Sequence, residues 1–334
     1  MKRYNIIKLK NITPVHISVG KDKDYDFAET ILHSDVLSSA LAAIRVIFKG
    51  KDDDVKEFLS SFALSSAYPF RCGDLFLPKP LGRMDVDVYE GTKRMEEVNY
   101  RKRLKKLKFL HIGLWNDIIQ GMRPIVDIRQ INGEFLFSQT GEQRECFRSE
   151  VVQRVSVAKN EAEDNTLFFF ERRFFSNDSG LYVITDAEGE LFDELFELFE
   201  LLGQEGIGSG KSIGGGQFEV ERDTVDINAA EDGNAQILLS MYLPQREEME
   251  KLNLDESVFE IALRGGFMAG SEHENLRHLR KKSIYMFKPS SIFATCEPLC
   301  GKVEDLRPEY NNGRMHAVYR SGKPLFIPIK RNVL

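Results

Sequence analysis

The sequence predicts an α+β fold, in which a first domain of four strands and two helices is followed by a second, weaker version of the same pattern. Two observations predict it. Several segments either alternate apolar and polar residues or are dense in aromatic and β-branched residues, and two amphipathic helical segments lie between them. The 334 residues, 42% hydrophobic and 29% charged, are enough to build two globular cores.

The first half of the first domain consists of one strand and one helix. In residues 4–12, apolar side chains at positions 7 and 9 alternate with lysines at positions 8 and 10, which is the period of a half-buried strand. A loop is expected over residues 13–30. Residues 33–48 then predict a helix, because Ser34 or Asp35 can cap its first amides and positions 37, 41, 44 and 48 form one apolar face.

The second half of this domain follows a large insertion. Residues 64–164 are rich in proline, glycine and charge and show no regular period. Residues 166–175 and 180–185 favour a hairpin, residues 188–203 predict a helix that ends at Gly203, and residues 217–227 predict a strand. With the insertion set aside, residues 1–228 have the β-α-β-β-α-β order of a ferredoxin-like (RRM-like) domain.

Residues 229–334 predict a second, degenerate ferredoxin-like domain. Its expected elements are a strand at 236–243, a short helix at 245–252, a strand at 257–264, strands near 284–296 and a last pair within 315–329. Prolines close several of these segments, which favours edge or terminal positions for them.

The composition argues against several classes of protein. The chain has no apolar run long enough to cross a bilayer and no signal-like apolar core, so we expect a cytoplasmic protein. The four cysteines, Cys72, Cys146, Cys296 and Cys300, form no CxxC pair, and the six histidines show no metal-binding spacing. We therefore expect no metal and no other cofactor.

The net charge is −6, but the charges are strongly segregated. Residues 93–108 carry eight basic and two acidic side chains, and residues 277–288 carry five basic and no acidic ones. Residues 311–334 carry five Lys or Arg and no Asp or Glu, whereas residues 186–205 carry eight acids and no base. Local basic zones attract phosphates even on an acidic protein. For each run taken alone, a solvated face is the alternative.

The densest motif is 206-GIGSGKSIGGGQF-218, with six glycines within residues 206–216. A nucleotide-binding G-x4-G-K-[ST] loop would need a glycine at position 205, which is glutamate. Nucleotide loops also lead into a helix N-terminus, whereas this motif leaves a helix C-terminus and enters a strand. Glycines allow a backbone to approach closely and expose its amides, and Lys211 adds a positive charge. The motif therefore favours contact with a sugar–phosphate backbone over a flexible linker.

With these features the sequence resembles the RAMP superfamily of CRISPR proteins, in which a glycine-rich loop joins the second helix of a ferredoxin-like domain to its last strand. Finer features resemble the Cas5-like subunit four of the type III-A effector, the Csm complex. They are 14-PVHIS-18, 33-HSDVLSSAL-41, 238-LLSMYLP-244, 264-RGGF-267 with 283-SIYMFKPSSIF-293, and 316-HAVYRSGKPLFIPI-329. Together with the glycine motif, they span nearly the whole chain.

The resemblance implies a non-catalytic subunit. Such a subunit binds the 5′ handle of the crRNA, docks the Cas10-type large subunit and contacts the first backbone RAMP subunit. It further implies that the insertion at 64–164 is a thumb-like element near the duplex of crRNA and target RNA.

The candidate RNA-binding residues fall into four groups. The glycine motif contributes Gly206, Gly208, Gly210, Lys211, Ser212, Gly214, Gly215 and Gly216. His16 and Ser18 follow the first strand, and a buried, satisfied histidine is the alternative for His16. The basic run contributes Lys102, Arg103, Lys105 and Lys106, for which a solvated helix face is the alternative. Arg264 precedes a glycine pair and is the last candidate.

Two other functions stay open on the sequence alone. Some RAMP relatives are metal-independent endoribonucleases that use a histidine general base, and His16 or His33 could be offered for that role. For His33 and Asp35 we favour a role at the start of the helix instead. A plain scaffold without RNA contact is the other alternative.

Overall fold

The computed structural model describes residues 1–18, 28–50, 53–89, 94–140, 145–156, 166–267, 279–308 and 315–331. Its centre is an eight-stranded sheet with the order β12-β1-β11-β2-β3-β5-β8-β7. The strands of this sheet are β1 (Lys2–Lys10), β2 (Tyr68–Arg71), β3 (Asp74–Pro78), β5 (Phe109–His111), β7 (Ile131–Asn132), β8 (Phe135–Leu136), β11 (Ser179–Thr185) and β12 (Glu219–Ile227).

The first four strands of this order form the unit that the sequence predicts. Strands β12, β1, β11 and β2 are antiparallel neighbours, α1 (Ser34–Lys49) follows β1, and α5 (Gly189–Glu205) follows β11. This is the strand order of a β-α-β-β-α-β unit. Both helices begin within one residue of the predicted position, and α1 ends at Gly50, which adopts the left-handed conformation that favours glycine.

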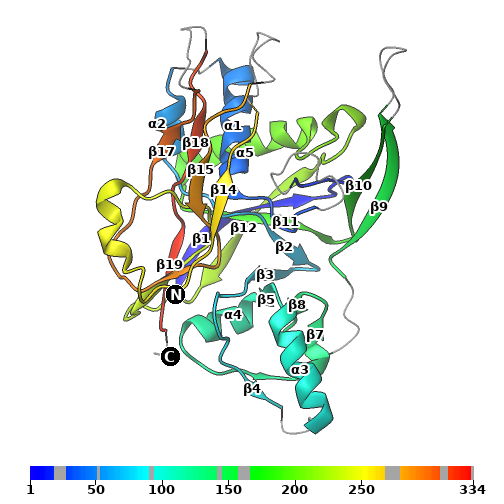
Figure 1. Ribbon diagram of the computed structural model, residues 1–334, viewed down its shortest axis with the longest axis vertical. Helices are drawn as coiled ribbons and strands as arrows, with labels where there is room; N and C mark the ends of the chain where they lie inside the picture. Colours follow the sequence, from blue (N-terminus) through cyan, green and yellow to red (C-terminus); the bar gives the residue numbers. More distant parts are fainter. Residues whose placement is uncertain are drawn as a thin grey trace.

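The sheet separates two cores. On one face, Ile7 and Leu9 of β1 pack with Leu41 of α1 and Phe199 of α5. Alternate side chains of a strand point to opposite faces, so the neighbouring Ile6 contributes to the other core. Figure 1 shows α1 and α5 at the upper end of the molecule.

The predicted insertion at 64–164 is wrong in its extent and its character. Strand β2 is the second strand of the unit and lies inside that range, so the inserted segment runs from β2 to β11. Strands β3, β5, β8 and β7 also extend the main sheet. The apolar runs in these strands are short and separated by charged turns, which hid their period. Residues 90–93, 141–144 and 157–165 of this range lie outside the described residues.

Further short elements of the inserted segment lie at the lower end of Figure 1. They include β4 (Asp87–Val88), α3 (Arg94–Lys106), α4 (Ile112–Ile119), β6 (Ile125–Val126) and the 3₁₀ turn η1 (Ile128–Gln130). Trp115 of α4 is fully buried, and its Nε1 donates to the carbonyl of Pro78 at 3.0 Å. A short helix α2 (Val55–Ser60) follows α1.

The predicted hairpin between residues 166–175 and 180–185 is also wrong. Strand β10 (Thr166–Phe175) has the predicted bounds but pairs with β9 (Phe147–Ser156) over its whole length. The two form a separate ribbon, seen at the right of Figure 1. Strand β11 uses both of its edges for β1 and β2 and has none left for β10.

The C-terminal part consists of small antiparallel sheets. Strand β13 (Ala235–Leu238) pairs with β16 (Ile292–Phe293) and β19 (Phe326–Ile329). Two further pairs are β14 (Ile261–Arg264) with β15 (Ile284–Phe287) and β17 (Val303–Asp305) with β18 (Tyr319–Ser321).

Two details of this part differ from the sequence prediction. The helix expected at 245–252 is a pair of 3₁₀ turns, η3 (Arg246–Glu248) and η4 (Glu250–Leu252). The two strands expected as a pair within 315–329 belong to different sheets, β18 to that of β17 and β19 to that of β13. In both places, packing and hydrogen bonds with segments distant in the sequence decide the structure, although the local sequence pattern favours a different one.

The C-terminal part shares a core with the first unit. Ile237 and Ile327 pack in the same cluster as Ile6 and Tyr182 of the main sheet, and the hydroxyl of Tyr68 donates to the carbonyl of Leu239 at 2.6 Å. The two parts therefore meet across the face of the sheet that α1 and α5 leave open. Among the helices that the structure describes, none is long and apolar enough to cross a membrane.

Candidate nucleic-acid interface

The glycine loop (residues 206–216) between α5 and β12 has a defined backbone. The amide of Ile207 donates to the carbonyl of Gly216 at 2.9 Å, and the amide of Gly215 donates to the carbonyl of Gly210 at 3.1 Å. Between these closures, residues Lys211–Ile213 form one 3₁₀ turn, η2. The loop is therefore folded onto itself and is no flexible linker.

Three of the glycines are required by close packing inside the loop. A Cβ added to Gly216 would lie 2.0 Å from the carbonyl oxygen of Ile207, and one added to Gly208 would lie 2.4 Å from that of His16. At Gly206 the nearest atom, the carbonyl oxygen of Gly215, would be 2.7 Å away. All three also have positive φ, from 73° to 83°. No side chain fits these positions without a backbone shift.

The tip of the loop faces solvent. Lys211, Ser212 and Gly214 are exposed, whereas Gly206, Gly215 and Gly216 are buried beneath them. With the residues that the structure describes, Lys211 forms no ion pair. The buried glycines thus shape the loop, and its exposed tip presents one ammonium group.

The first loop (residues 13–18) holds the glycine loop in place. The amide of Ser209 donates to the carbonyl of His16 at 2.9 Å, and the hydroxyl of Thr13 donates to the carbonyl of Gly214 at 2.8 Å. Ser18 is exposed and bridges to Ala28. Two segments about two hundred residues apart in the chain therefore form one surface.

His16 is a buried histidine, which was the alternative to an RNA contact. Its side chain is fully buried, its Nδ1 lies 2.9 Å from the carbonyl oxygen of Glu171, and its ring centroid lies 4.6 Å from that of Phe170. Both partners belong to β10 of the ribbon. His16 thus joins the first loop to the ribbon.

Two arginines that sequence reasoning missed strengthen this junction. Arg172 donates to the carbonyl of Pro14 at 3.4 Å, and Arg173 donates to that of Ala28 at 2.8 Å. Burial lowers the pKa of Arg173, whose guanidinium also lies 4.8 Å from the ring centroid of Phe147. The sequence signal that could have revealed these residues is a pair of arginines inside the apolar run 166-TLFFFERRFF-175.

The basic run lies elsewhere. Lys102, Arg103, Lys105 and Lys106 are exposed on α3. Helix α3 is at the lower end of Figure 1, whereas α5, which leads into the glycine loop, is at the upper end. The structure therefore does not bring these four residues together with the glycine loop.

Arg264 points inward. Its Nε and Nη2 donate to the carboxylate of Asp35 at 2.9 and 3.1 Å, and only 10% of its side chain is exposed. Arg320 of β18 donates to the same carboxylate. Although burial of Asp35 opposes ionisation, the two arginines lower the pKa of Asp35 to about 2. Asp35 lies in the first turn of α1, as expected, but it also ties that helix to the C-terminal part.

His33 is a buried residue at the start of α1. Its Nε2 lies 2.7 Å from a carboxylate oxygen of Glu29, and 7% of its side chain is exposed. The hydrogen bond and charge of His33 hold the pKa of Glu29 below its usual value, against the effect of burial. Neither His16 nor His33 is placed at the surface as a general base would require.

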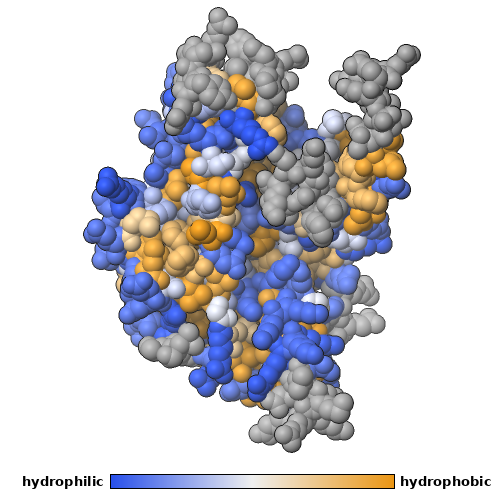
Figure 2. All heavy atoms as spheres, in the orientation of Figure 1, coloured by the Kyte–Doolittle hydropathy of each residue, from blue (hydrophilic) through white to orange (hydrophobic). Residues whose placement is uncertain are grey.

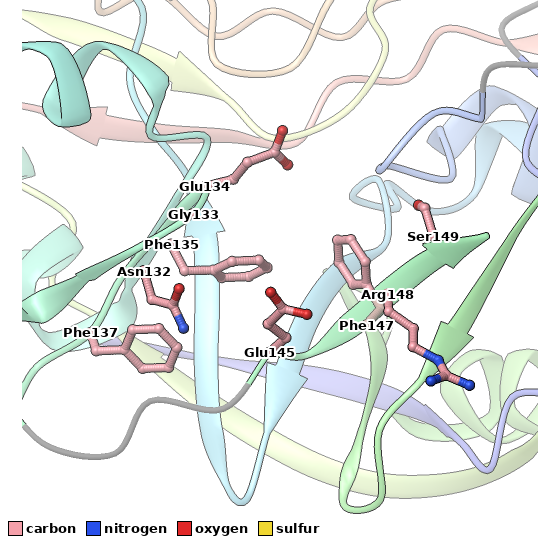
Figure 3. Close-up of a pocket in the computed structure, with 9 residues that line it drawn as sticks. All are labelled: Asn132, Gly133, Glu134, Phe135, Phe137, Glu145, Phe147, Arg148 and Ser149. Atoms are coloured by element: carbon pink, nitrogen blue, oxygen red, sulfur yellow. The ribbon is translucent and has the colours of Figure 1, made fainter. Parts of the chain in front are cut away.

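A pocket of about 330 Å³ lies where the ribbon leaves the main sheet. Figure 3 shows the carboxylate of Glu145 beside the rings of Phe135 and Phe147, whereas the side chain of Arg148 points away. The pocket was missed from the sequence because its residues fall in the range interpreted as irregular. Its acidic and aromatic lining does not suit a phosphate. Among the described residues, no group of three His, Cys, Asp or Glu could hold a metal ion.

The strand order of the main sheet and the anchored glycine loop between α5 and β12 are the features by which the sequence resembles RAMP proteins. Residues 231–329 match the family described as the CRISPR Csm4 C-terminal domain. The CRISPR system Cms protein Csm4 of Streptococcus thermophilus is 27% identical over 277 residues, 80% of this chain and 81% of the relative. The protein of the same name from Thermococcus onnurineus (strain NA1) is 24% identical over 279 residues, 83% of this chain and 87% of the relative. Most of the chain is therefore similar to proteins named Csm4, and its C-terminal part matches their C-terminal domain, which confirms the resemblance seen in the sequence.

Solved structures show the same fold. A chain of the Csm3-Csm4 subcomplex of the type III-A CRISPR-Cas interference complex matches with a TM-score of 0.63 and 19% identity, over 99% of this chain and 100% of the other. A chain of the Csm1-Csm4 cassette in complex with cA4 matches with a TM-score of 0.62 and 19% identity, over 99% of both chains. The α+β arrangement described above is therefore shared with these chains.

Proposed function

We propose that the protein is a non-catalytic, cytoplasmic subunit of a type III-A CRISPR effector. In this role it binds the 5′ handle of the crRNA and links the Cas10-type large subunit to the backbone RAMP subunits. The observation that carries the proposal is the anchored glycine loop, whose exposed Lys211 forms no ion pair with the described residues, in a chain that is similar to Csm4 proteins. In the similar solved structures, Csm4 is assembled with Csm1 in one case and with Csm3 in the other.

The glycine loop suits an extended phosphate backbone better than a single nucleotide. It leaves the C-terminal end of α5, where the helix dipole is negative, so attraction to phosphate comes from Lys211 and not from the helix. In the exposed stretch 211–214, the small residues Ser212 and Gly214 lie close to that charge, which lets a phosphate backbone approach it. We assign the handle contact to this stretch, with Ser18 at its side.

Two exposed apolar faces are candidate contact surfaces, one for a protein partner and the other near the duplex of crRNA and target RNA. Ile261, Leu263 and Tyr285 are 53%, 57% and 63% exposed on one face of the β14–β15 pair, and Figure 2 shows hydrophobic residues gathered there. Exposed apolar patches of this kind mark interaction sites. We propose the β14–β15 face as a contact with another protein subunit.

The ribbon β9–β10 also has an exposed apolar face. It is formed by Val151, Val155, Leu167 and Phe169. We propose the ribbon and the basic helix α3 as the thumb-like part that approaches the duplex of crRNA and target RNA. We also interpret residues 229–334 as a degenerate second RAMP domain, since β13 and its neighbours cover the main sheet as a paired domain would.

The non-catalytic role rests on the two histidines. A general base must reach the 2′-hydroxyl that it deprotonates, whereas His16 and His33 are buried and engaged with Glu171 and Glu29. Incubation of the purified protein with repeat RNA in the absence of metal tests this role. Site-specific cleavage that disappears in His16→Ala or His33→Ala would identify an endoribonuclease instead.

RNA binding is tested by crosslinking of the crRNA to the assembled complex. Lys211→Ala should reduce crosslinking of the handle, whereas Lys56→Ala, which removes an exposed lysine of α2, should leave it unchanged. Equal crosslinking in the wild type and both variants would support a scaffold without RNA contact.

A further inference from the structure

Strand β14 is paired along one edge only. Its residues Ile261–Arg264 pair with β15 in an antiparallel register that places Leu263 opposite Tyr285. Figure 1 shows the two strands next to each other, β14 in yellow and β15 in orange. In the part of the chain that the structure describes, no strand pairs with the other edge of β14. This edge is therefore open to a further strand.

The register fixes which backbone groups of β14 point to its open edge. In an antiparallel pair, opposite residues alternate between those that exchange backbone hydrogen bonds and those that exchange none. The amide of Lys288 donates to the carbonyl of Glu260 at 2.8 Å, so this pair is bonded and the next pair along the strands is not. Phe287 belongs to that next pair, and its amide and carbonyl bond instead to Tyr242, at 2.9 and 3.0 Å. The backbone groups of its partner in β14 therefore point in the opposite direction, to the open edge.

Ile261 and Leu263 are the two residues whose backbone groups point to the open edge. Among the described residues, their amides and carbonyls have no backbone hydrogen-bond partner. The two residues are two positions apart, which is the spacing at which an added strand forms its hydrogen bonds. Both side chains are more than half exposed and lie on one face of the pair. An extended segment with apolar side chains at alternate positions would thus complete both the hydrogen bonds and the apolar face.

Other sheet edges of the protein carry features that prevent such pairing. Charged side chains, prolines and very short strands keep an edge from pairing with a foreign strand. Strand β12, at one edge of the main sheet, has charged residues at five of its nine positions, and β7, at the other edge, has two residues. The edge strand β19 contains Pro328. In β14 the only charged residue, Arg264, turns inward to Asp35. The open edge of β14 is therefore suited to pairing.

We propose that the open edge of β14 receives an extended strand of the protein subunit that contacts the β14–β15 face. This contact rests on the proposed function, which supplies the partner subunit. The added strand is held by main-chain hydrogen bonds to Ile261 and Leu263. Its apolar side chains, at alternate positions, pack beside those of the same two residues.

The size of the edge favours another subunit over a second copy of this chain. Two copies paired through β14 alone would join only four residues on each side. A stable interface takes about 20–30 residues on each side. A subunit that also contacts the β14–β15 face buries further surface, so the added strand is one part of a larger interface.

Hydrogen–deuterium exchange at single amides tests the added strand. The purified full chain is compared with the co-expressed complex that contains the Csm1-type and Csm3-type partners. In the chain alone, the amides of Ile261 and Leu263 should exchange fast, whereas those of Ala262 and Arg264, which bond to β15, should exchange slowly. In the complex, exchange at Ile261 and Leu263 should slow by about tenfold or more. If the complex forms and these two amides exchange as they do in the chain alone, the proposal is wrong.

A proline variant separates the open edge from the apolar face. Leu263→Pro removes an amide that β15 does not use, and proline is tolerated in edge strands where the missing N–H faces solvent. Assembly should weaken by about tenfold or more, because a carbonyl of the added strand loses its donor. The matched control is Leu263→Val, which keeps the amide and an apolar side chain and should assemble as the wild type does. Equal assembly of the two variants would contradict the added strand. The exchange measurement needs no variant, so it decides the question if Leu263→Pro folds poorly.

The same experiments distinguish the occupant of the edge. Exchange at Ile261 and Leu263 that slows as the concentration of the chain alone is raised would assign the edge to a second copy and overturn the proposal. Assembly with handle crosslinking, but without slower exchange in β14, would reject the added strand and leave the proposed function intact. Failure of the wild type to assemble with either partner would reject both.

Discussion

At the level of single residues, Asp35 connects the two parts of the protein. We expect Asp35→Asn to destabilise the protein by roughly 3–5 kcal/mol, because it leaves the buried charges of Arg264 and Arg320 without a counter-ion. Chemical denaturation of the purified chain measures this. The control is Asp226→Asn, which breaks an exposed pair with Arg3 and should change stability far less. A similar loss in both variants would contradict the role assigned to Asp35.

The pKa of Asp35 also predicts an effect of acid. The pKa is about 2 in the folded protein against 3.8 ordinarily, so the unfolded chain binds the proton more tightly. The stability that Asp35 contributes is complete above about pH 4 and is lost as the pH falls towards 2. Unfolding free energies measured across this window should fall more steeply for the wild type than for Asp35→Asn. Parallel curves would disprove the linkage.

The lowered pKa of Lys281 predicts a pH dependence of the same sign in alkali. Its pKa is lowered to about 8 by burial and by Arg320 and Arg264, against the opposing effect of Asp35. Between about pH 8 and 10 the unfolded chain therefore binds the proton that the folded chain has released, and stability rises with pH. The wild type should gain stability over this range relative to Lys281→Gln. A flat difference between the two proteins would mean that Lys281 is solvated and charged.

At the level of elements, the glycine loop combines two kinds of glycine. Gly214 has φ of 75° and no protein atom closer than 3.8 Å to an added Cβ, so Gly214→Ala should cost only the strain of a left-handed residue, about 1–2 kcal/mol. Gly216→Ala brings the same strain and also a contact of 2.0 Å with the carbonyl of Ile207, so it should displace the loop. Handle crosslinking should therefore fall much more in Gly216→Ala than in Gly214→Ala. Equal effects would show that the fold of the loop does not matter for binding.

The elements show what the sequence could predict and what it could not. Helices α1 and α5 were predicted within two residues at each end because the period of an apolar face is a local signal, although the side-chain cap expected from Ser34 or Asp35 is not formed in α1. The bounds of β10 were predicted for the same reason, but its pairing with β9 was not, because partner choice depends on residues outside the strand. The Asp35 cluster joins residues 229 and 285 positions apart, for which a single sequence carries no signal.

At the level of the whole molecule, the main sheet organises the contacts. Its α1 and α5 face leads into the glycine loop, and its other face is covered by β13, β16 and β19. Strands β14 and β15 lie outside these layers and turn an apolar face to solvent. The RNA and protein contacts that we propose are thus separated in space, and variants should affect one without the other.

The β14–β15 face provides the test of this separation. Leu263 is 57% exposed, so Leu263→Asp should leave the fold intact but place a charge in an apolar contact. Because central apolar contacts of an interface contribute about 2 kcal/mol or more, assembly with the Csm1-type or the Csm3-type partner should weaken by more than about tenfold. Co-purification of the co-expressed complex measures this, with Ile125→Asp as the control, since Ile125 is 65% exposed on β6. Assembly of Leu263→Asp with both partners at the wild-type level would remove the β14–β15 face from the interface, whereas loss of one partner with retained handle crosslinking would establish it.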